Sequence, residues 1–325
     1  MEYQATIGME VHAELRTKTK MFCNSKNDSE EKHPNINICP VCLGHPGTLP
    51  VANKEAVRQV QRVGLALGSE IQKFSRFDRK NYFYPDLPKG YQISQYQHPL
   101  VGGGNLNGVR ITRVHLEEDT ARLIHDEKDS TLVDFNRAGV PLMELVTEPD
   151  LHDAKSAREF CEELQLLLRY LGASDANMEK GEMRCEANIS LSGSTAELGI
   201  KVEIKNLNSF RAVEEAIEYE IERQKKILEK GEEVKQETKG WDENKKSTFS
   251  QRSKESARDY RYFPEPDLPP MEFGDEYINN LRSTIPELPA QKRARLKEEY
   301  KITDNLVEIL KHDKDLAAVW HKMIT

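Results

Sequence analysis

Residues 3 to 16 alternate strictly between apolar and polar side chains, and this pattern restricts the segment to one secondary structure. Its odd positions are all apolar, and its even positions are polar or glycine. Successive side chains of a β-strand point to opposite faces, so the pattern predicts a strand with one face in the core. Its polar face then carries Glu10, His12 and Glu14 in a row.

Acidic residues or histidine occupy alternate positions in three later strand-like stretches as well. Carboxylates from several strands of one sheet suit Mg²⁺, which takes oxygen ligands, and a neighbouring histidine suits Mn²⁺ or Zn²⁺. Solvated glutamates on a polar face are the alternative, although glutamate is depleted in strands. We therefore expect a divalent-metal site on a sheet. The three stretches are His115-Leu-Glu117-Glu118-Asp119, Leu142-Met-Glu144-Leu-Val-Thr-Glu148 and Glu182-Met-Arg184-Cys-Glu186-Ala-Asn188.

The composition is that of a globular protein, with 325 residues, 37% hydrophobic and 31% charged. This length allows one large domain or two. No run is apolar enough to span a bilayer and the N-terminus lacks a secretory pattern, so we expect no membrane contact and a cytoplasmic location. A net charge of −8 argues against non-specific nucleic-acid binding but leaves room for a local basic patch.

The order of predicted elements indicates an α+β fold with a mostly antiparallel sheet, because strands often follow one another without a crossover helix. The stretch 231–262 reads as a loop or an edge hairpin, and 182–192 with 200–206 reads as a hairpin. We expect a catalytic domain over residues 1–290 and the beginning of a helical domain over 291–325. The predicted helices are 53–68, 153–172 and 209–230, and the further strands are 109–118, 131–136, 141–148, 182–192 and 200–206.

Five cysteines without a secretory signal favour reduced thiols or metal ligands over disulfides. Cys39 and Cys42 form a Cys-x-x-Cys turn that, with Cys23 and His33 or His45, could hold a structural Zn²⁺. A redox pair and simple free thiols remain open alternatives. The other two, Cys161 and Cys185, fall on apolar faces and are expected in the core.

Two further motifs carry chemistry that suits phosphates. Basic and aromatic residues interleave over 77–95, as in loops that contact phosphates and stack on bases, although an ordinary surface loop has the same composition. Lys205 precedes a predicted helix N-terminus, where an anion could bind, and the alternative is a solvated lysine beside a capped helix. Gly102–Gly104 is a weak phosphate-loop candidate and reads better as a hairpin turn.

The chain resembles the B subunit of the heterotrimeric tRNA-dependent amidotransferases along its whole length. The resemblance implies a catalytic domain like that of glutamine synthetase. The matching motifs, in order, are Ile7-Gly-Met-Glu-Val-His12-Ala-Glu-Leu15, Phe77-Asp-Arg-Lys-Asn-Tyr-Phe-Tyr-Pro-Asp86, His115-Leu-Glu-Glu-Asp119, Asp134-Phe-Asn-Arg-Ala-Gly139, Lys205-Asn-Leu-Asn-Ser209 and Asp259-Tyr-Arg-Tyr-Phe-Pro-Glu-Pro-Asp267.

The resemblance also implies a reaction, its cofactors and its partners. Such a subunit is a ligase that forms carbon-nitrogen bonds with glutamine as amido donor. It uses ATP and Mg²⁺ to phosphorylate the side-chain carboxylate of Glu or Asp on mischarged tRNA, and ammonia then displaces the phosphate. The ammonia comes from a glutaminase A subunit, and a small C subunit completes the heterotrimer. The alternatives are a tRNA-binding scaffold with a structural metal site and a free-standing ligase acting on small amino acids.

The family pattern implies roles for specific residues of this chain. Glu118 joins the metal set only if a bulge turns it to the face of Glu117. The catalytic set implied is Glu10, His12, Glu118, Glu144, Lys80 and Lys205. The Mg²⁺ ligands implied are Glu10, His12, Glu117, Glu118, Glu144 and Glu186. Lys89, Tyr82, Asn206 and Arg184 are implied in binding the nucleotide, and Cys23, Cys39 and Cys42 in holding Zn²⁺.

The chain departs from the family pattern at two points. Zinc-bearing members have Cys-x-Cys before the Cys-x-x-Cys turn, whereas Cys23 is followed here by Asn24 and Ser25, so one ligand is missing. Members also continue beyond the equivalent of Thr325 into a tail domain that grips tRNA. We therefore expect a C-terminally short form with reduced tRNA affinity.

Overall fold

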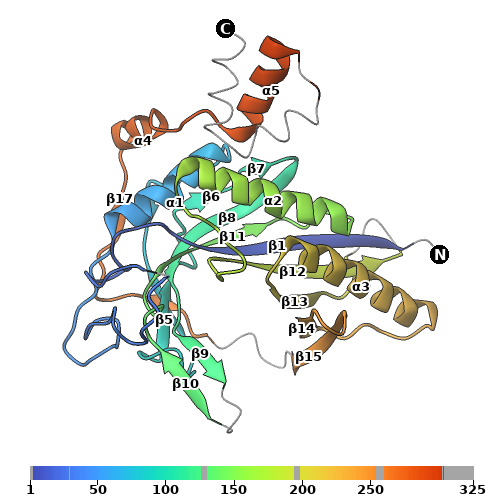
Figure 1. Ribbon diagram of the computed structural model, residues 1–325, viewed down its shortest axis with the longest axis horizontal. Helices are drawn as coiled ribbons and strands as arrows, with labels where there is room; N and C mark the ends of the chain where they lie inside the picture. The colour runs from blue at the N-terminus through green and yellow to red at the C-terminus, as the bar shows by residue number, and fades with distance from the viewer. Residues whose placement is uncertain are drawn as a thin grey trace.

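A ten-stranded, mostly antiparallel sheet organises the computed structural model (Figure 1). The structure describes residues 3–301 and 303, apart from 29, 126–129, 194–197, 254–259 and 302. Along the sheet the strands follow the order β15, β14, β13, β12, β1, β11, β8, β6 and β2, with β7 paired to β8. They comprise β1 (Gln4–Glu14), β2 (Glu70–Ile71), β6 (Val101–Gly102), β7 (Asn105–Leu106), β8 (Val109–Glu118), β11 (Pro141–Thr147), β12 (Met183–Ser192), β13 (Val202–Leu207), β14 (Glu237–Asp242) and β15 (Ser247–Ser253).

The N-terminal strand β1 lies in the middle of this sheet, as its alternating pattern allows. It pairs antiparallel with β11 on one side and with β12 on the other. The side chains of Ile7, Met9 and Val11 are almost fully buried. Because registry between strands keeps like faces together, one face of the sheet is apolar and the other collects the polar residues.

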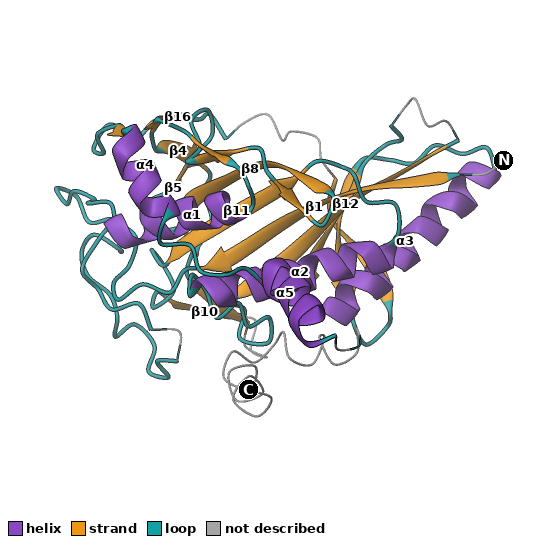
Figure 2. Cartoon of the chain, turned by 90° about the horizontal axis from the view of Figure 1, so that it is seen from above, coloured by secondary structure: helices purple, strands orange, loops and turns teal. Residues whose placement is uncertain are grey.

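Three helices cover the apolar face (Figures 1 and 2). They are α1 (Lys54–Ala66), α2 (Ala154–Leu171) and α3 (Phe210–Glu229). Each begins after a residue whose side chain accepts backbone N–H bonds of the first turn: Asn53, Asp153 and Ser209. Gly172 ends α2 in the left-handed conformation that glycine adopts without strain. The three predicted helices and their caps are confirmed.

Small sheets and the chain ends complete the architecture. A three-stranded sheet of β16 (Phe263–Pro264), β4 (Asp78–Asn81) and β5 (Tyr91–Ser94) reaches the polar face, because the hydroxyl of Ser94 contacts Glu117. The remaining elements are β3 (Phe74–Ser75) with β17 (Met271–Glu272), β9 (Arg122–His125) with β10 (Thr131–Asp134), α4 (Asp275–Arg282) and α5 (Pro289–Tyr300).

Most predicted strands are confirmed, and so is the hairpin of β12 and β13. The stretch 231–262 forms the edge hairpin β14–β15, but β14 pairs in parallel with β13 and buries Trp241. The boundary expected near residue 290 stays a prediction, and most of 291–325 beyond α5 lies outside the described residues. No helix within the described part of the chain is long and apolar enough to cross a bilayer.

Candidate active site on the polar face of the sheet

Strand register brings five titratable side chains onto one patch of the polar face. His12 of β1 lies opposite Glu144 of β11, and Glu144 lies opposite His115 of β8. Two positions further along their strands, Glu10 and Glu117 point to the same side because strand side chains repeat every second residue. We call Glu10, His12, His115, Glu117 and Glu144 the acidic cluster.

The two histidines of the acidic cluster converge on one carboxylate oxygen. The Nε2 atoms of His12 and His115 lie 3.3 and 3.2 Å from Oε2 of Glu144. Each Nε2 also lies 3.7 Å from an oxygen of Glu117. His12, His115, Glu117 and Glu144 are largely buried, so charges in the cluster are weakly screened.

Burial and mutual charge shift the pKa values within the cluster in opposite directions. Burial, and then the negative charges of Glu144 and Glu186, raise the pKa of Glu10 to about 7. Burial also acts to lower the pKa of His12, but the contact with Glu144 outweighs it and the pKa rises to about 9. The same opposition raises the pKa of His115 to about 9. This site therefore concentrates negative charge and holds positive charge strongly.

A second group of carboxylates adjoins Glu10. Oxygens of Glu10, Glu186 and Glu203 lie within 4.8 Å of one another. The ammonium of Lys205 donates to Glu186 at 2.8 Å and lies 3.8 Å from Glu203. Glu186 and Lys205 thus lie beside the acidic cluster, as the resemblance implied.

The acidic cluster opens into a cleft of about 1250 Å³, which we call the main cleft. Lys80 and Tyr82 line it, together with Glu10, His115, Glu144 and Lys205. Burial acts to lower the pKa of Lys80, but Glu117 and Glu144 raise it above its usual value. The lysine ammonium is therefore held charged above the carboxylates of the cluster.

Glu118 does not join the acidic cluster, contrary to the expected set. The register between β8 and β11 is regular through Glu117 and Glu118, so no bulge turns Glu118 to the polar face. Lys89 instead contacts both carboxylate oxygens of Glu118 at 2.5 Å, and the N–H of Ile93 donates to one of them at 2.9 Å. Lys89 is thereby held away from the main cleft as well.

Two further expected nucleotide contacts also lie elsewhere. Arg184 faces the polar side but donates to both oxygens of Asp119, beyond the acidic cluster. Asn206 is exposed, with a backbone φ of 64°, and does not line the main cleft. Because β12 and β13 shift register between Cys185 and Ala187, position 206 lies where the regular alternation of the hairpin has been lost.

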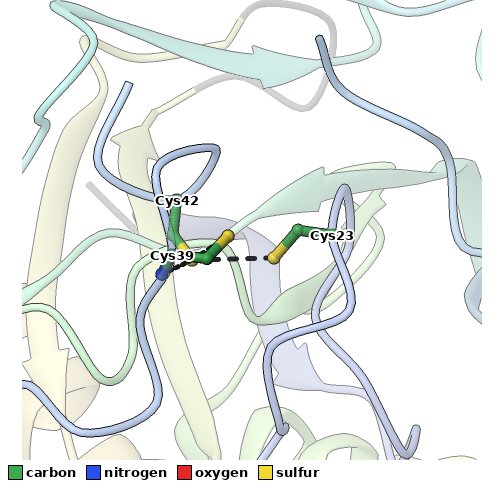
Figure 3. A group of neighbouring side chains, drawn as sticks. All are labelled: Cys23, Cys39 and Cys42. Atoms are coloured by element: carbon green, nitrogen blue, oxygen red, sulfur yellow. Dashed lines mark hydrogen bonds between the residues drawn. The ribbon is translucent and has the colours of Figure 1, made fainter. Parts of the chain in front are cut away.

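The three cysteines of the sequence motif meet in the segment that joins β1 to α1 (Figure 3). The Sγ atom of Cys42 lies 3.6 Å from that of Cys23 and 3.5 Å from that of Cys39. Contacts with Cys23 lower the pKa of Cys42 to about 4, helped by Ser25 and the charge of Lys20. Ser25 thus stands beside the thiols, where its hydroxyl lies 3.4 Å from Cys42 Sγ.

Comparison with known proteins identifies the family. The model of the GatB/GatE catalytic domain matches residues 5–279. The chain belongs to this family. The B subunit of the aspartyl/glutamyl-tRNA(Asn/Gln) amidotransferase of Thermotoga petrophila is 49% identical over 338 residues, covering 100% of this chain and 70% of the relative. The same subunit of Persephonella marina is 51% identical over 334 residues, covering 100% of this chain and 70% of the relative.

GatB/GatE membership confirms the resemblance drawn from the motifs, and it makes the chain an amidotransferase subunit. Sequence reasoning gave no role to His115, Arg113 or Glu203, although all three line the main cleft. Arg113 and His115 alternate with Glu117 along β8, so the signal was present. What the sequence did not reveal was which of Glu117 and Glu118 shares their face.

Proposed function

We propose that this chain activates the side-chain carboxylate of Glu or Asp esterified to mischarged tRNA. ATP phosphorylates the carboxylate, and ammonia displaces the phosphate, which gives Gln-tRNA(Gln) or Asn-tRNA(Asn). Phosphorylation is needed because a free carboxylate has no good leaving group. The acidic cluster on the floor of the main cleft carries the proposal, and the names of the relatives, which mention these tRNAs, support it.

The donor set of the acidic cluster fits a hard divalent cation, Mg²⁺ or Mn²⁺. Its carboxylates are held close enough to raise the pKa of Glu10 to about 7, first through burial and then through Glu144 and Glu186. The Nδ1 atom of His115 is buried without a hydrogen-bond partner. Glu10, His12, Glu117 and Glu144 would hold the ion, with Glu186 beside it. A bound cation there neutralises the charge that gathers between ATP and the substrate carboxylate.

The cationic side chains of the main cleft bind and orient the phosphates in this proposal. Lys80 stays charged because Glu117 and Glu144 raise its pKa against the effect of burial. Arg113 lies 3.7 Å from Glu144 and Lys205 donates to Glu186, so both place positive charge at the rim of the cluster. Tyr82 lies against Lys80, with the ammonium 5.9 Å from the ring centroid. These groups attract the triphosphate while the carboxylates remain free for the cation.

The partners follow from the chemistry. The described residues show no glutaminase-like nucleophile and base in the main cleft, so ammonia must come from elsewhere. We propose that a glutaminase A subunit supplies it from glutamine and that a small C subunit completes the assembly. The alternative is a tRNA-binding scaffold whose metal site is structural. The positive charge of Lys80 above the acidic cluster favours catalysis, because a purely structural cation needs no phosphate-binding neighbour.

The deciding experiment combines the chain with the A and C subunits, mischarged tRNA and γ-labelled ATP. We expect phosphate release that requires mischarged tRNA, and amide formation when glutamine is present. Glu144→Gln should reduce both by at least about a hundredfold, because it removes the carboxylate on which both histidines converge. Glu148→Gln is the matched control, because Glu148 follows the same strand and bonds Thr112 instead. Wild-type amide formation by Glu144→Gln would refute this site.

For the cysteine group we propose a structural Zn²⁺ bound by Cys23, Cys39 and Cys42. The three Sγ atoms lie within 4.8 Å of one another, as ligands of one ion would. Metal analysis of the purified protein tests this directly. We expect about one zinc per chain, lost in Cys39→Ser and retained in Cys161→Ser, whose thiol is in the core. A zinc-free wild-type protein with three titratable thiols at the motif would contradict the proposal.

A further inference from the structure

Two tyrosines form a stacked pair at the edge of the main cleft. The ring centroids of Tyr96 and Tyr262 are 4.3 Å apart and the rings are nearly parallel, at 9°. Tyr96 follows β5 and is 57% exposed, and Tyr262 precedes β16 on a distant part of the chain. The hydrophobic core does not account for an exposed, aligned aromatic pair, whereas stacking on a planar ligand does.

The pair stands at the boundary between two cavities. Tyr96, Tyr262 and Phe263 line both the main cleft and a neighbouring cavity of about 660 Å³, which we call the side cavity. No residue of the acidic cluster lines the side cavity. Its walls contribute two arginines instead, Arg76 and Arg261. Aromatic faces with guanidinium groups are the surroundings that nucleic-acid bases and phosphates find in single-strand binding sites.

The arginines of the side cavity are held in place. Arg76 donates to Gln97 at 2.8 Å, and its Nε lies 3.4 Å from the buried carboxylate of Asp78. Arg261 has a backbone φ of 41°, in the left-handed region that side chains other than glycine rarely adopt.

Asn81 fixes this strained turn. Its backbone N–H donates to the carbonyl of Tyr260 at 2.8 Å, and its side chain donates to the carbonyl of Arg261 at 2.8 Å. Strain of this kind persists only where the surroundings impose it, and it concentrates at ligand sites. The turn therefore presents Arg261 and the ring of Tyr262 at fixed positions between the two cavities.

Two nucleotides must reach this region if the proposed function holds: ATP and the 3′ end of tRNA. The cations that face the acidic cluster, Lys80, Arg113 and Lys205, all line the main cleft, so the triphosphate belongs there. Exposed aromatics continue outward from the stacked pair, with Phe83 92%, Tyr84 60% and Phe263 44% exposed. A row of exposed rings suits consecutive bases of a single strand better than the one base of ATP.

Resting on the proposed function, we propose that Tyr96 and Tyr262 form the platform on which the 3′-terminal base of the tRNA stacks. The side cavity then receives this terminal nucleotide, with Arg76 and Arg261 near its phosphate. The esterified amino acid projects from the same nucleotide past the shared wall, toward the acidic cluster. The stacked pair is thus a positioning element that separates the RNA end from the triphosphate.

The first experiment measures steady-state kinetics of the complete complex. Tyr96→Ala and Tyr262→Ala should each raise KM for mischarged tRNA about tenfold or more, as loss of one stacking contact implies. KM for ATP should stay within about twofold. Tyr96→Phe keeps the ring and should behave as wild type. Phe249→Ala is the matched control, because Phe249 is 46% exposed and lines neither cavity.

The second experiment observes the base itself and needs no catalysis. A tRNA that ends in 2-aminopurine should lose fluorescence when the wild-type complex binds it, and should keep it with either alanine variant. An increase in KM for ATP instead of tRNA would overturn the inference, as would wild-type kinetics in both variants. If the wild type releases no phosphate with mischarged tRNA, the proposed function fails, while quenching still decides whether the tyrosines stack on the tRNA end.

Discussion

Two adjacent glutamates of β8 have entirely different surroundings. Glu117 lies on the polar face, accepts the hydroxyl of Ser94 at 2.9 Å and faces both cluster histidines. Glu118 lies on the other face, where Lys89 is its partner and the side chains are only 3% and 12% exposed. One position in the strand therefore separates a group that takes part in the candidate chemistry from a group that holds the fold.

Substituting the two residues should separate these roles. Glu117→Gln should abolish amide formation but change the free energy of unfolding by no more than about 1 kcal/mol, because its loss also relieves repulsion with Glu144. Glu118→Gln should destabilise the protein by about 3 kcal/mol, because it leaves the Lys89 ammonium buried without its charged partner. Urea unfolding of the metal-free protein measures both. Equal destabilisation by the two changes would contradict this division.

Helix α1 approaches the sheet so closely that one of its residues must lack a side chain. A Cβ atom on Gly64 would lie 2.6 and 2.7 Å from the methyl carbons of Val101, which is fully buried in β6. Helix α2 depends instead on its first turn, where Asp153 accepts the N–H of Ser156 at 2.8 Å. Each helix thus owes its position or its stability to a named end or contact.

Gly64→Ala should destabilise the protein by about 1–3 kcal/mol through overpacking, although alanine favours a helix by about 1 kcal/mol over glycine. Thermal unfolding measures the loss. In the background Val101→Ala the clash is gone, so the same substitution should become neutral or stabilising. Destabilisation of the same size in both backgrounds would show that the close approach is not the cause.

Asp153→Ala should cost about 1 kcal/mol at pH 7, because it removes the cap of α2. The backbone N–H of Ser156, followed by its hydroxyl, holds the pKa of Asp153 below its usual value. A depressed carboxylate pKa gives stability that is present above the unfolded-state pKa and is lost as the pH falls through the folded-state pKa. The difference between wild type and variant should therefore shrink below about pH 4. Urea unfolding between pH 3 and 7 tests this, and a gap that widens in acid would contradict it.

The molecule as a whole joins its last described helix to the sheet layer through charge. Arg293 of α5 donates to both oxygens of Glu163 in α2, at 2.6 and 3.0 Å, and both side chains are mostly buried. Apolar contact is limited, with Leu296 buried under the helix. The attachment of α5 therefore rests on few contacts, and it can open without unfolding the sheet.

Glu163→Gln should expose α5 while leaving the sheet intact. Limited proteolysis should cut between Pro289 and Tyr300 about ten times faster than in wild type, because the paired carboxylate is gone. The main thermal transition should move by only a few degrees. Glu162→Gln is the control, because this neighbour is paired with Arg158 on α2 itself. Unchanged cleavage in Glu163→Gln would show that other contacts hold the helix.

Local patterns predicted much of the fold and part of the candidate site. Alternation along 3–16 placed Glu10 and His12 on the polar face, and capping residues located the three helices. The parallel pairing of β13 with β14 was not predictable, because α3 lies between them and strand partners are set by packing between distant segments. For the same reason the sequence could not show that Ser94 reaches Glu117.

The central place of β1 affects how the protein can be made. This strand is synthesised first, but its neighbours β11 and β12 begin at Pro141 and Met183, over a hundred residues later. At about 5–20 residues per second, the ribosome needs on the order of ten seconds to supply the first of them. During that time an apolar strand with two open edges remains without partners, a state prone to aggregation. Biosynthesis of this fold therefore depends on protection of the nascent chain until the centre of the sheet can close.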